Sequence, residues 1–237
     1  MKLEVVLTPH RVPPKLGAAV VIDVLRASST ITTALAHGAK SIQTTISEEE
    51  ALKLAQGEEN PILGGERQGL KIPGFQLGNS PAEYTREVVA GRKLIFTTTN
   101  GTATIARAKE SRLSPILIGS FLNFSALMQR IEELRPAALY LFCAGRGGAF
   151  SLEDAAFAGL LCQELGGELS DSAIAARAIW REWEGDIPGL FAASEHGRYM
   201  KSIGFASDLE LCAAVDKYQV VPQLLGSELV SGLEKNN

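Results

Sequence analysis

The sequence predicts an α/β protein with a layered α/β/α arrangement around a mostly parallel or mixed sheet. Short runs rich in Val, Ile and Leu alternate with longer stretches in which apolar residues recur at helical spacing. Gly, Pro and Ser separate these segments. Most of the short runs are continuously apolar, as expected of strands that helices cover on both faces. A chain of 237 residues with 46% hydrophobic residues can bury a large core.

Eight segments have the length and composition of strands. They are residues 3–7, 18–23, 41–45, 62–65, 94–98, 116–119, 138–143 and 218–222. Three helices begin with a Ser that is followed three residues later by an acid, as in a capping box, and a glycine closes each of them. The predicted helices are Ser47 to Gly57, Ser80 to Gly91, Ser151 to Gly166, 123–134, 171–183 and 207–216.

The chain shows no internal repeat and no low-complexity linker, so we expect a single domain over residues 1–237. The weakest point is at residues 112–114, where a division into two subdomains would fall.

Charge and cysteine content narrow the class of function. The net charge of -4 leaves no broad basic face, which argues against nucleic acid and favours a small-molecule ligand. No apolar stretch approaches the roughly 18 residues that span a bilayer, and the first residues lack a signal-peptide pattern. Cys143, Cys162 and Cys212 form no C-x-x-C pair, which is typical of a reducing compartment. We therefore expect a cytoplasmic protein without membrane association.

Residues 20–30 contain a strand that ends in Asp23 and continues through Arg26 and three hydroxyl residues into a helix. Ligands of open α/β sheets bind at the carboxyl ends of strands, so we expect Asp23 to face a ligand. The hydroxyl residues would lie at a helix N-terminus, where free amides stabilise an anion. They are Ser28, Ser29 and Thr30. In the structural alternative, a serine caps the helix and Asp23 satisfies a turn.

A long glycine-rich loop at residues 64–81 contains the pair Glu66 and Arg67, and Asn79 near its end. Long ordered loops are often functional, and glycines allow the backbone to approach a ligand closely. A carboxylate next to a guanidinium suits a metal beside an anion. The structural alternative is a surface loop with an exposed ion pair.

The strand that ends near residue 98 continues through Asn100, Gly101 and Thr102 into a helix. Asn and Gly tolerate a left-handed backbone, and Thr102 offers a hydroxyl and an amide to an oxyanion. An ordinary strand-to-helix turn is the alternative.

A fourth turn, within residues 142–154, carries Arg146 among glycines and leads through Ser151 into a helix whose first turn holds two acids, including Asp154. In the structural alternative these acids complement the helix dipole. A cysteine phosphatase cradle has five residues between Cys and Arg, whereas Cys143 lies three positions before Arg146. We therefore expect Cys143 to be a buried strand residue.

The four turns together are more specific than any one of them. They supply Asp23, Glu66, Asn100 and Asp154, together with Arg26, Arg67 and Arg146. Acids for a hard cation, arginines for an anion and helix N-termini for phosphate are the components of a metal-assisted phosphoryl-transfer site.

The chain resembles the 2-phosphosulfolactate phosphatases of coenzyme M biosynthesis. The matching segments occur in order over nearly the whole chain: residues 22–30, 65–67, 74–75, 78–81, 97–102, 143–146 and 150–154. The resemblance implies a magnesium-dependent hydrolase that converts 2-phospho-3-sulfolactate to 3-sulfolactate and phosphate. It also implies an α/β fold specific to the family, and a homodimer.

On this hypothesis, Asp23, Glu66 and Asp154 are the catalytic acids and the ligands of Mg²⁺. Asp23 is either the nucleophile or a metal ligand that orients water, and the sequence leaves both roles open. The expected substrate-binding residues are Arg26, Ser28, Ser29, Thr30, Arg67, Asn79, Asn100, Gly101, Thr102, Arg146 and Ser151. We place His196 outside the catalytic core, as a packed or solvated side chain. The alternative function is a non-catalytic protein that binds or senses a small anion.

Overall fold

A computed structural model describes residues 1–10 and 15–232 of the chain. Within these residues, eleven strands form one mixed sheet. The strands are β1 (Lys2–Val6), β2 (Ala18–Ile22), β3 (Ser41–Thr45), β4 (Ile62–Arg67), β5 (Leu70–Lys71), β6 (Lys93–Thr97), β7 (Ile116–Gly119), β8 (Ala138–Cys143), β9 (Glu168–Leu169), β10 (Pro222–Leu225) and β11 (Glu228–Ser231). Their order across the sheet is β5-β4-β6-β3-β11-β10-β7-β2-β8-β1-β9.

The sheet consists of two parallel blocks joined by an antiparallel hairpin. β4, β6 and β3 form one block, and β7, β2, β8, β1 and β9 form the other. β10 and β11 turn at Gly226, which has a φ of +63°. The hairpin pairs with β3 on one side and with β7 on the other, both antiparallel. Three antiparallel steps therefore separate the blocks, and the two blocks run in opposite directions along the sheet.

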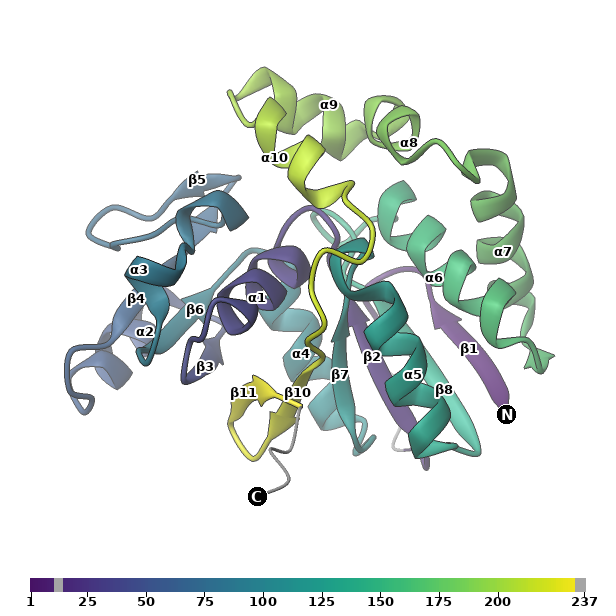
Figure 1. Ribbon diagram of the computed structural model, residues 1–237, viewed down its shortest axis with the longest axis horizontal. Coiled ribbons are helices and arrows are strands. Elements are labelled where there is room, and N and C mark those ends of the chain that lie inside the picture. Colours follow the sequence, from purple (N-terminus) through teal and green to yellow (C-terminus); the bar gives the residue numbers. More distant parts are fainter. Residues whose placement is uncertain (11–14, 233–237) are drawn as a thin grey trace.

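Helices cover both faces of the sheet (Figure 1). The α-helices are α1 (Ala27–Ala36), α2 (Glu48–Ala55), α3 (Arg86–Val89), α4 (Gly101–Glu110), α5 (Phe124–Leu134), α6 (Leu152–Leu165), α7 (Asp171–Trp183), α8 (Ile187–Ala193), α9 (Glu195–Ser202) and α10 (Ala206–Cys212). Short 3-10 turns lie at Pro81–Glu83 and Phe121–Asn123. Helices α8, α9 and α10 gather together at the top of the view in Figure 1.

Alternate residues of β2 enter two different cores, because successive side chains of a strand point to opposite faces. Val20 and Ile22 pack with residues of α5 and α6, whereas Val21 packs with residues of α1 and α4. Each fully buried Val or Ile contributes roughly 1.5–3 kcal/mol to stability. The continuous apolar pattern of this strand follows from its coverage on both faces.

The predicted fold class is confirmed, and most predicted strands form. Those at 3–7, 18–23, 41–45, 62–65, 94–98, 116–119 and 138–143 correspond to β1, β2, β3, β4, β6, β7 and β8. The strand predicted at 218–222 is wrong, because pairing starts only at Pro222. Val220 and Val221 are buried without belonging to a strand. The division into subdomains near residues 112–114 stays a prediction.

The helix starts at Ser47 and Ser151 are confirmed. The Ser47 hydroxyl accepts a hydrogen bond from the Glu50 amide at 3.1 Å. The helix predicted from Ser80 to Gly91 is wrong as a single element: it divides into a 3-10 turn and the short α3. Its expected cap is absent because the Ser80 hydroxyl donates to Asp208 instead, at 2.7 Å.

The remaining helix predictions differ mainly at their ends. The helix from Ser47 ends at Ala55, and Gly57 does not adopt the expected left-handed conformation. The helix predicted at 207–216 ends at Cys212, while α8 and α9 were not predicted. Among the described residues, no helix combines the length and hydropathy needed to cross a bilayer.

Candidate active site

A cavity of about 320 Å³ lies where strands of both parallel blocks end. Asp23 follows β2, Glu66 lies near the end of β4, Asn100 follows β6 and Arg146 follows β8. Helix α9 contributes His196 to the same wall. The cavity therefore collects residues from all four turns that the sequence singled out.

One oxygen of the Asp23 carboxylate accepts a hydrogen bond, and the other has no hydrogen-bond partner among the described residues. Its Oδ1 accepts a hydrogen bond from the Ala27 amide at 3.2 Å, and no described residue bonds to Oδ2. Burial raises the pKa of Asp23 to about 6. The charge of His196 lowers this pKa, and the charge of Glu66 raises it further, but both effects are smaller than that of burial. A Cβ at Gly101 would lie 2.6 Å from Oδ2, so this position requires glycine for close approach.

Glu66 fixes the wall of the cavity on the β4 side and is 6% exposed. Its Oε1 accepts the amide of Thr99 at 2.8 Å, and its Oε2 accepts the amide of Gly69 at 2.6 Å. The Thr99 hydroxyl adds a longer bond of 3.3 Å. Since a carboxylate accepts about four hydrogen bonds, Glu66 retains capacity for a ligand.

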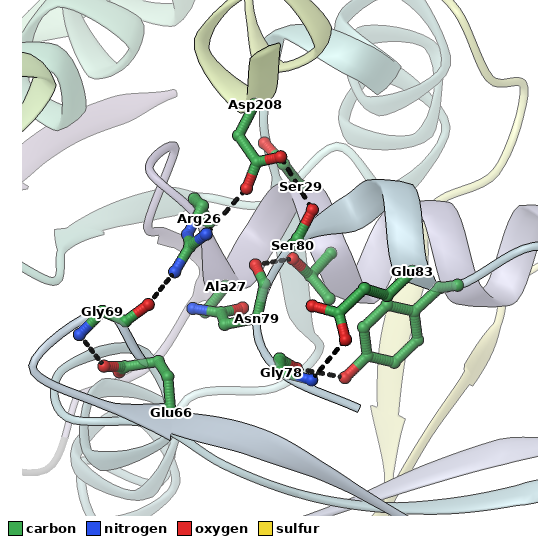
Figure 2. Close-up of polar contacts among 12 residues, drawn as sticks. Arg26, Ala27, Ser29, Glu66, Gly69, Gly78, Asn79, Ser80, Glu83 and Asp208 are labelled. Atoms are coloured by element: carbon green, nitrogen blue, oxygen red, sulfur yellow. Dashed lines mark hydrogen bonds and ion pairs between the residues drawn. The ribbon is translucent and has the colours of Figure 1, made fainter. Parts of the chain in front are cut away.

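Arg26 lines the cavity, but its charge is already paired (Figure 2). Nη1 donates to Oδ2 of Asp208 at 2.7 Å, and Nη2 donates to the carbonyl of Gly69 at 2.6 Å. The guanidinium carbon stacks 4.1 Å above the ring centre of Phe205. Asp208 also accepts the Ser80 hydroxyl. The structure thus gives Arg26 a positioning role, because it joins α10 to Gly69 in the turn that follows β4.

Arg67, the other half of the predicted Glu-Arg pair, does not line the cavity. It donates to the Thr97 hydroxyl at 3.1 Å and forms an ion pair with Glu48 at 3.3 Å. About a third of its side chain is exposed. Arg67 therefore forms a partly exposed ion pair with Glu48, whereas Glu66 is buried, so the exposed Glu66–Arg67 pair of the structural alternative does not form.

Arg146 is the cation of the cavity that keeps its donors available. Its guanidinium stacks 4.5 Å from the ring centre of Tyr199, and it hydrogen-bonds to none of the described side chains. Tyr199 is itself held by a hydrogen bond to the carbonyl of Gln68 at 2.8 Å. The amide of Gly147 donates to Oδ1 of Asn100 at 3.2 Å, which joins the turns after β8 and β6.

Asp154 does not line the cavity. Its Oδ1 accepts the amide of Val24 at 2.9 Å, and its Oδ2 accepts the amide of Gly145 at 3.1 Å. Burial, together with the charges of Asp23 and Glu153, raises the pKa of Asp154 well above its usual range. The structure therefore shows Asp154 joining the ends of β2 and β8.

The neighbouring acid Glu153 contacts His196, which lines the cavity. Its Oε1 lies 3.1 Å from Nδ1 of His196. Burial by itself raises the pKa of Glu153, but the hydrogen bond and the charge of His196 outweigh burial and lower it. The sequence marked two acids here and favoured Asp154 over Glu153. No local pattern distinguishes them, because the partner lies 43 residues away.

The predicted hydroxyl ligands bond within the fold. Ser28 accepts the amide of Asp23, Ser29 donates to the carbonyl of Val24, Thr30 donates to the carbonyl of Asn79, and Thr102 exchanges bonds with Thr98. Ser151 caps α6 and lines a neighbouring cavity of about 630 Å³. Ser151 is thus a helix cap, whereas neither Ser28 nor Ser29 caps α1, whose N-cap residue is Arg26 without a side-chain capping bond. Cys143 is buried, and burial raises the pKa of its thiol well above the usual range.

Oxygen ligands for a hard cation are present on one wall of the cavity. The Oδ1 atom of Asn79 is buried and has no hydrogen-bond partner among the described residues. Asn79 lines the cavity together with Asp23 and Glu66. Mg²⁺ needs only one or two protein carboxylates when water and substrate oxygens complete its octahedron, so these residues fit the ion. A group of three or more His, Cys, Asp or Glu ligands does not occur within residues 1–10 and 15–232.

A family model described as 2-phosphosulpholactate phosphatase matches residues 6–226. The chain belongs to the 2-phosphosulfolactate phosphatase family. A protein of Gloeobacter violaceus named probable 2-phosphosulfolactate phosphatase is 38% identical, over 98% of this chain and 100% of its own. Proteins with the same name from Thermotoga petrophila and Clostridium acetobutylicum are 38% and 39% identical, over 96% and 97% of this chain and 97% and 100% of theirs.

This membership confirms the family that the sequence motifs indicate, and with it the assignment of the chain to the phosphoric monoester hydrolases. In this member of the 2-phosphosulfolactate phosphatase family, the motif residues have two tasks. Asp23, Glu66, Asn79 and Arg146 line the cavity. Asp154 and the hydroxyl residues hold the strand ends in place.

Proposed function

We propose that this protein hydrolyses 2-phospho-3-sulfolactate to 3-sulfolactate and phosphate. The observation that carries the proposal is a cavity lined both by Asp23, whose Oδ2 makes no hydrogen bond within the described residues, and by Arg146, whose guanidinium is unpaired. A carboxylate placed to act at phosphorus and a cation placed to hold anionic oxygens are the minimum for phosphomonoester hydrolysis.

The substrate would carry phosphate, carboxylate and sulfonate groups, and residues of both charges line the cavity. These are the acids Asp23 and Glu66, and Arg146 with its stacking partner Tyr199. Guanidinium binds carboxylate, sulfonate or phosphate oxygens through two parallel hydrogen bonds. Arg146 would therefore orient the substrate, while Arg26 shapes the wall without offering a free charge.

We propose Mg²⁺ as cofactor on electrostatic grounds. Two carboxylates next to a phosphate dianion repel it unless a cation lies between them. Asp23, Glu66 and the unpartnered oxygen of Asn79 would hold the ion. When bound, the ion neutralises charge on the phosphoryl oxygens.

Each residue then has a defined task. Asp23 attacks phosphorus with its open oxygen or holds the water that attacks it. Glu66 keeps the loop at Gly69 and the turn at Thr99 at a fixed separation. Asp154 holds the backbone after β2, so that Asp23 cannot swing away from the cavity. Positioning of this kind preserves the near-attack geometry that lowers the barrier.

Phosphate release tests the proposal. Purified protein should release phosphate from 2-phosphosulfolactate, and more slowly from 2-phospholactate, in the presence of Mg²⁺. Release should stop with EDTA and return when Mg²⁺ is restored. Binding of the substrate without release would favour the anion-sensor alternative, and release that is insensitive to EDTA would refute the metal. The homodimer, the cytoplasmic location and the role in coenzyme M biosynthesis stay predictions.

A further inference from the structure

His196 stands between two cavities. It lines the cavity of about 320 Å³ that holds Asp23, and also the cavity of about 630 Å³ that Glu153 lines from the other side. Its side chain is 17% exposed, and that of Glu153 is 1% exposed. Nδ1 is engaged with Glu153 at 3.1 Å. Within the described part of the chain no hydrogen bond involves Nε2, the other ring nitrogen.

Both members of this pair are held by rigid surroundings. The Ser194 hydroxyl caps α9 by accepting the amide of Gly197 at 2.9 Å. A Cβ at Gly197 would lie 1.8 Å from the carbonyl of Phe191, so α9 packs against α8 right beside His196. Glu153 lies in the first turn of α6. The next residue, Asp154, fixes this turn by accepting hydrogen bonds from backbone amides at the ends of β2 and β8. The ring therefore has little freedom to turn away.

A carboxylate bonded to one ring nitrogen orients the imidazole and leaves the other nitrogen for the reaction. The nitrogen that remains belongs to a side chain in the wall of the Asp23 cavity. The charge of His196 also lowers the pKa of the Asp23 carboxyl, which burial raises. His196 therefore lines the same cavity as Asp23, the residue that we propose acts at phosphorus.

We propose that His196 is the general acid of the reaction and that Glu153 is its positioning residue. This inference rests on the proposed phosphatase function. As the new bond to phosphorus forms, the phosphorus–oxygen bond to the substrate alkoxide breaks and its electron pair stays on the leaving oxygen. That oxygen takes the proton from Nε2, which gives the neutral alcohol and a neutral imidazole.

The proton balance closes within the cycle. If Asp23 attacks, the neutral imidazole takes a proton from the water that then cleaves the phosphoryl group from Asp23, and phosphate leaves. If water attacks directly, Asp23 accepts the proton of that water and then releases it to solvent, and solvent returns a proton to the imidazole. In both routes the leaving oxygen needs the proton, because an alkoxide is a poor leaving group.

The test compares two substrates of the same size and charge. 2-Phospholactate must expel an alkoxide, whereas phosphoenolpyruvate expels a resonance-stabilised enolate that depends less on a proton. His196→Asn should lower kcat on 2-phospholactate by about 10²–10⁴-fold, the range of general acid catalysis, and by a much smaller factor on phosphoenolpyruvate. Glu153→Gln should show the same selectivity with a smaller loss.

A matched control and a rescue separate the acid from a structural residue. His37 is also partly buried and bonds through Nδ1 to the carbonyl of Tyr84, away from the cavity. His37→Asn should leave the ratio of the two rates unchanged. Imidazole added to His196→Ala should restore turnover of 2-phospholactate.

Failure of this inference can be told from failure of the proposed function. If the unmodified protein does not hydrolyse 2-phosphosulfolactate with Mg²⁺, the proposed function is wrong. If it is active but His196→Asn loses equal factors on both substrates, or loses nothing, His196 is not the general acid. Should phosphoenolpyruvate not be turned over at all, the rescue decides: an inactive His196→Ala that imidazole does not restore overturns the assignment.

Discussion

Asp23→Asn should abolish turnover and at the same time stabilise the protein. The carboxylate is 8% exposed and lies near two other acids. Burial raises its pKa from the usual value near 3.8 to about 6. At 1.36 kcal/mol per tenfold change in the proton equilibrium, ionisation of Asp23 costs the folded state up to about 3 kcal/mol at pH 8.

The sign of the pH dependence follows from the raised pKa. Between about pH 4 and pH 6, the unfolded chain loses its proton while the folded chain keeps it, so the free energy of unfolding falls as the pH rises. Asparagine carries no charge, and its side-chain oxygen can still accept the amide of Ala27. The variant should therefore be more stable by up to about 3 kcal/mol at pH 8 and by about half of that at pH 5.

Urea unfolding at both pH values measures this difference, and EDTA is included because a bound cation would stabilise the carboxylate. For 237 residues, 3 kcal/mol corresponds to about 6 °C in Tm. The exposed acid Glu110 provides a control, and Glu110→Gln should change stability by less than about 0.5 kcal/mol. An Asp23→Asn variant that is no more stable than the parent at pH 8, or whose gain does not shrink at pH 5, would refute the reasoning.

Substitutions at three further positions test the site. Arg146→Lys and Arg146→Ala should each lower kcat/KM by about 10- to 100-fold, because an ammonium group cannot form two parallel bonds; full activity of the Lys variant would contradict this. Gly101→Ala should lower kcat, since a Cβ would lie 2.6 Å from the Asp23 carboxylate, whereas Gly57→Ala meets nothing closer than 3.6 Å and should not. Asp208→Asn removes the charge that pairs with a buried guanidinium and should cost about 3–5 kcal/mol in urea unfolding; a loss under 1 kcal/mol would show that the pair is dispensable.

The sequence by itself predicted the elements that depend on neighbouring residues. The strand at 18–23 follows from an unbroken apolar run, and the start of α6 follows from a Ser with an acid three residues later. It also singled out all four turns that contribute to the cavity. These signals are local, because hydrogen bonds of caps and the periods of helix and strand join residues at most a few positions apart.

The direction of the strands was decided by the tertiary structure. The sequence placed the four turns at strand ends and predicted a mostly parallel or mixed sheet, without an order for its strands. The C-terminal hairpin separates two blocks of opposite direction, and the ends of both blocks meet at one cavity. Pairing between β11 and β3 joins residues nearly 190 positions apart, and no local pattern marks such a pairing.

The tertiary structure also decided which polar side chains line the cavity and remain unpaired. Arg26 is paired with a carboxylate 182 residues away. Glu153, and not Asp154, contacts His196, which sequence analysis had placed outside the catalytic core. The residue types at a strand end show that a polar site forms there. Which side chains remain available is set by the distant groups that satisfy the others, because a buried charge or donor takes the partner that the fold brings to it.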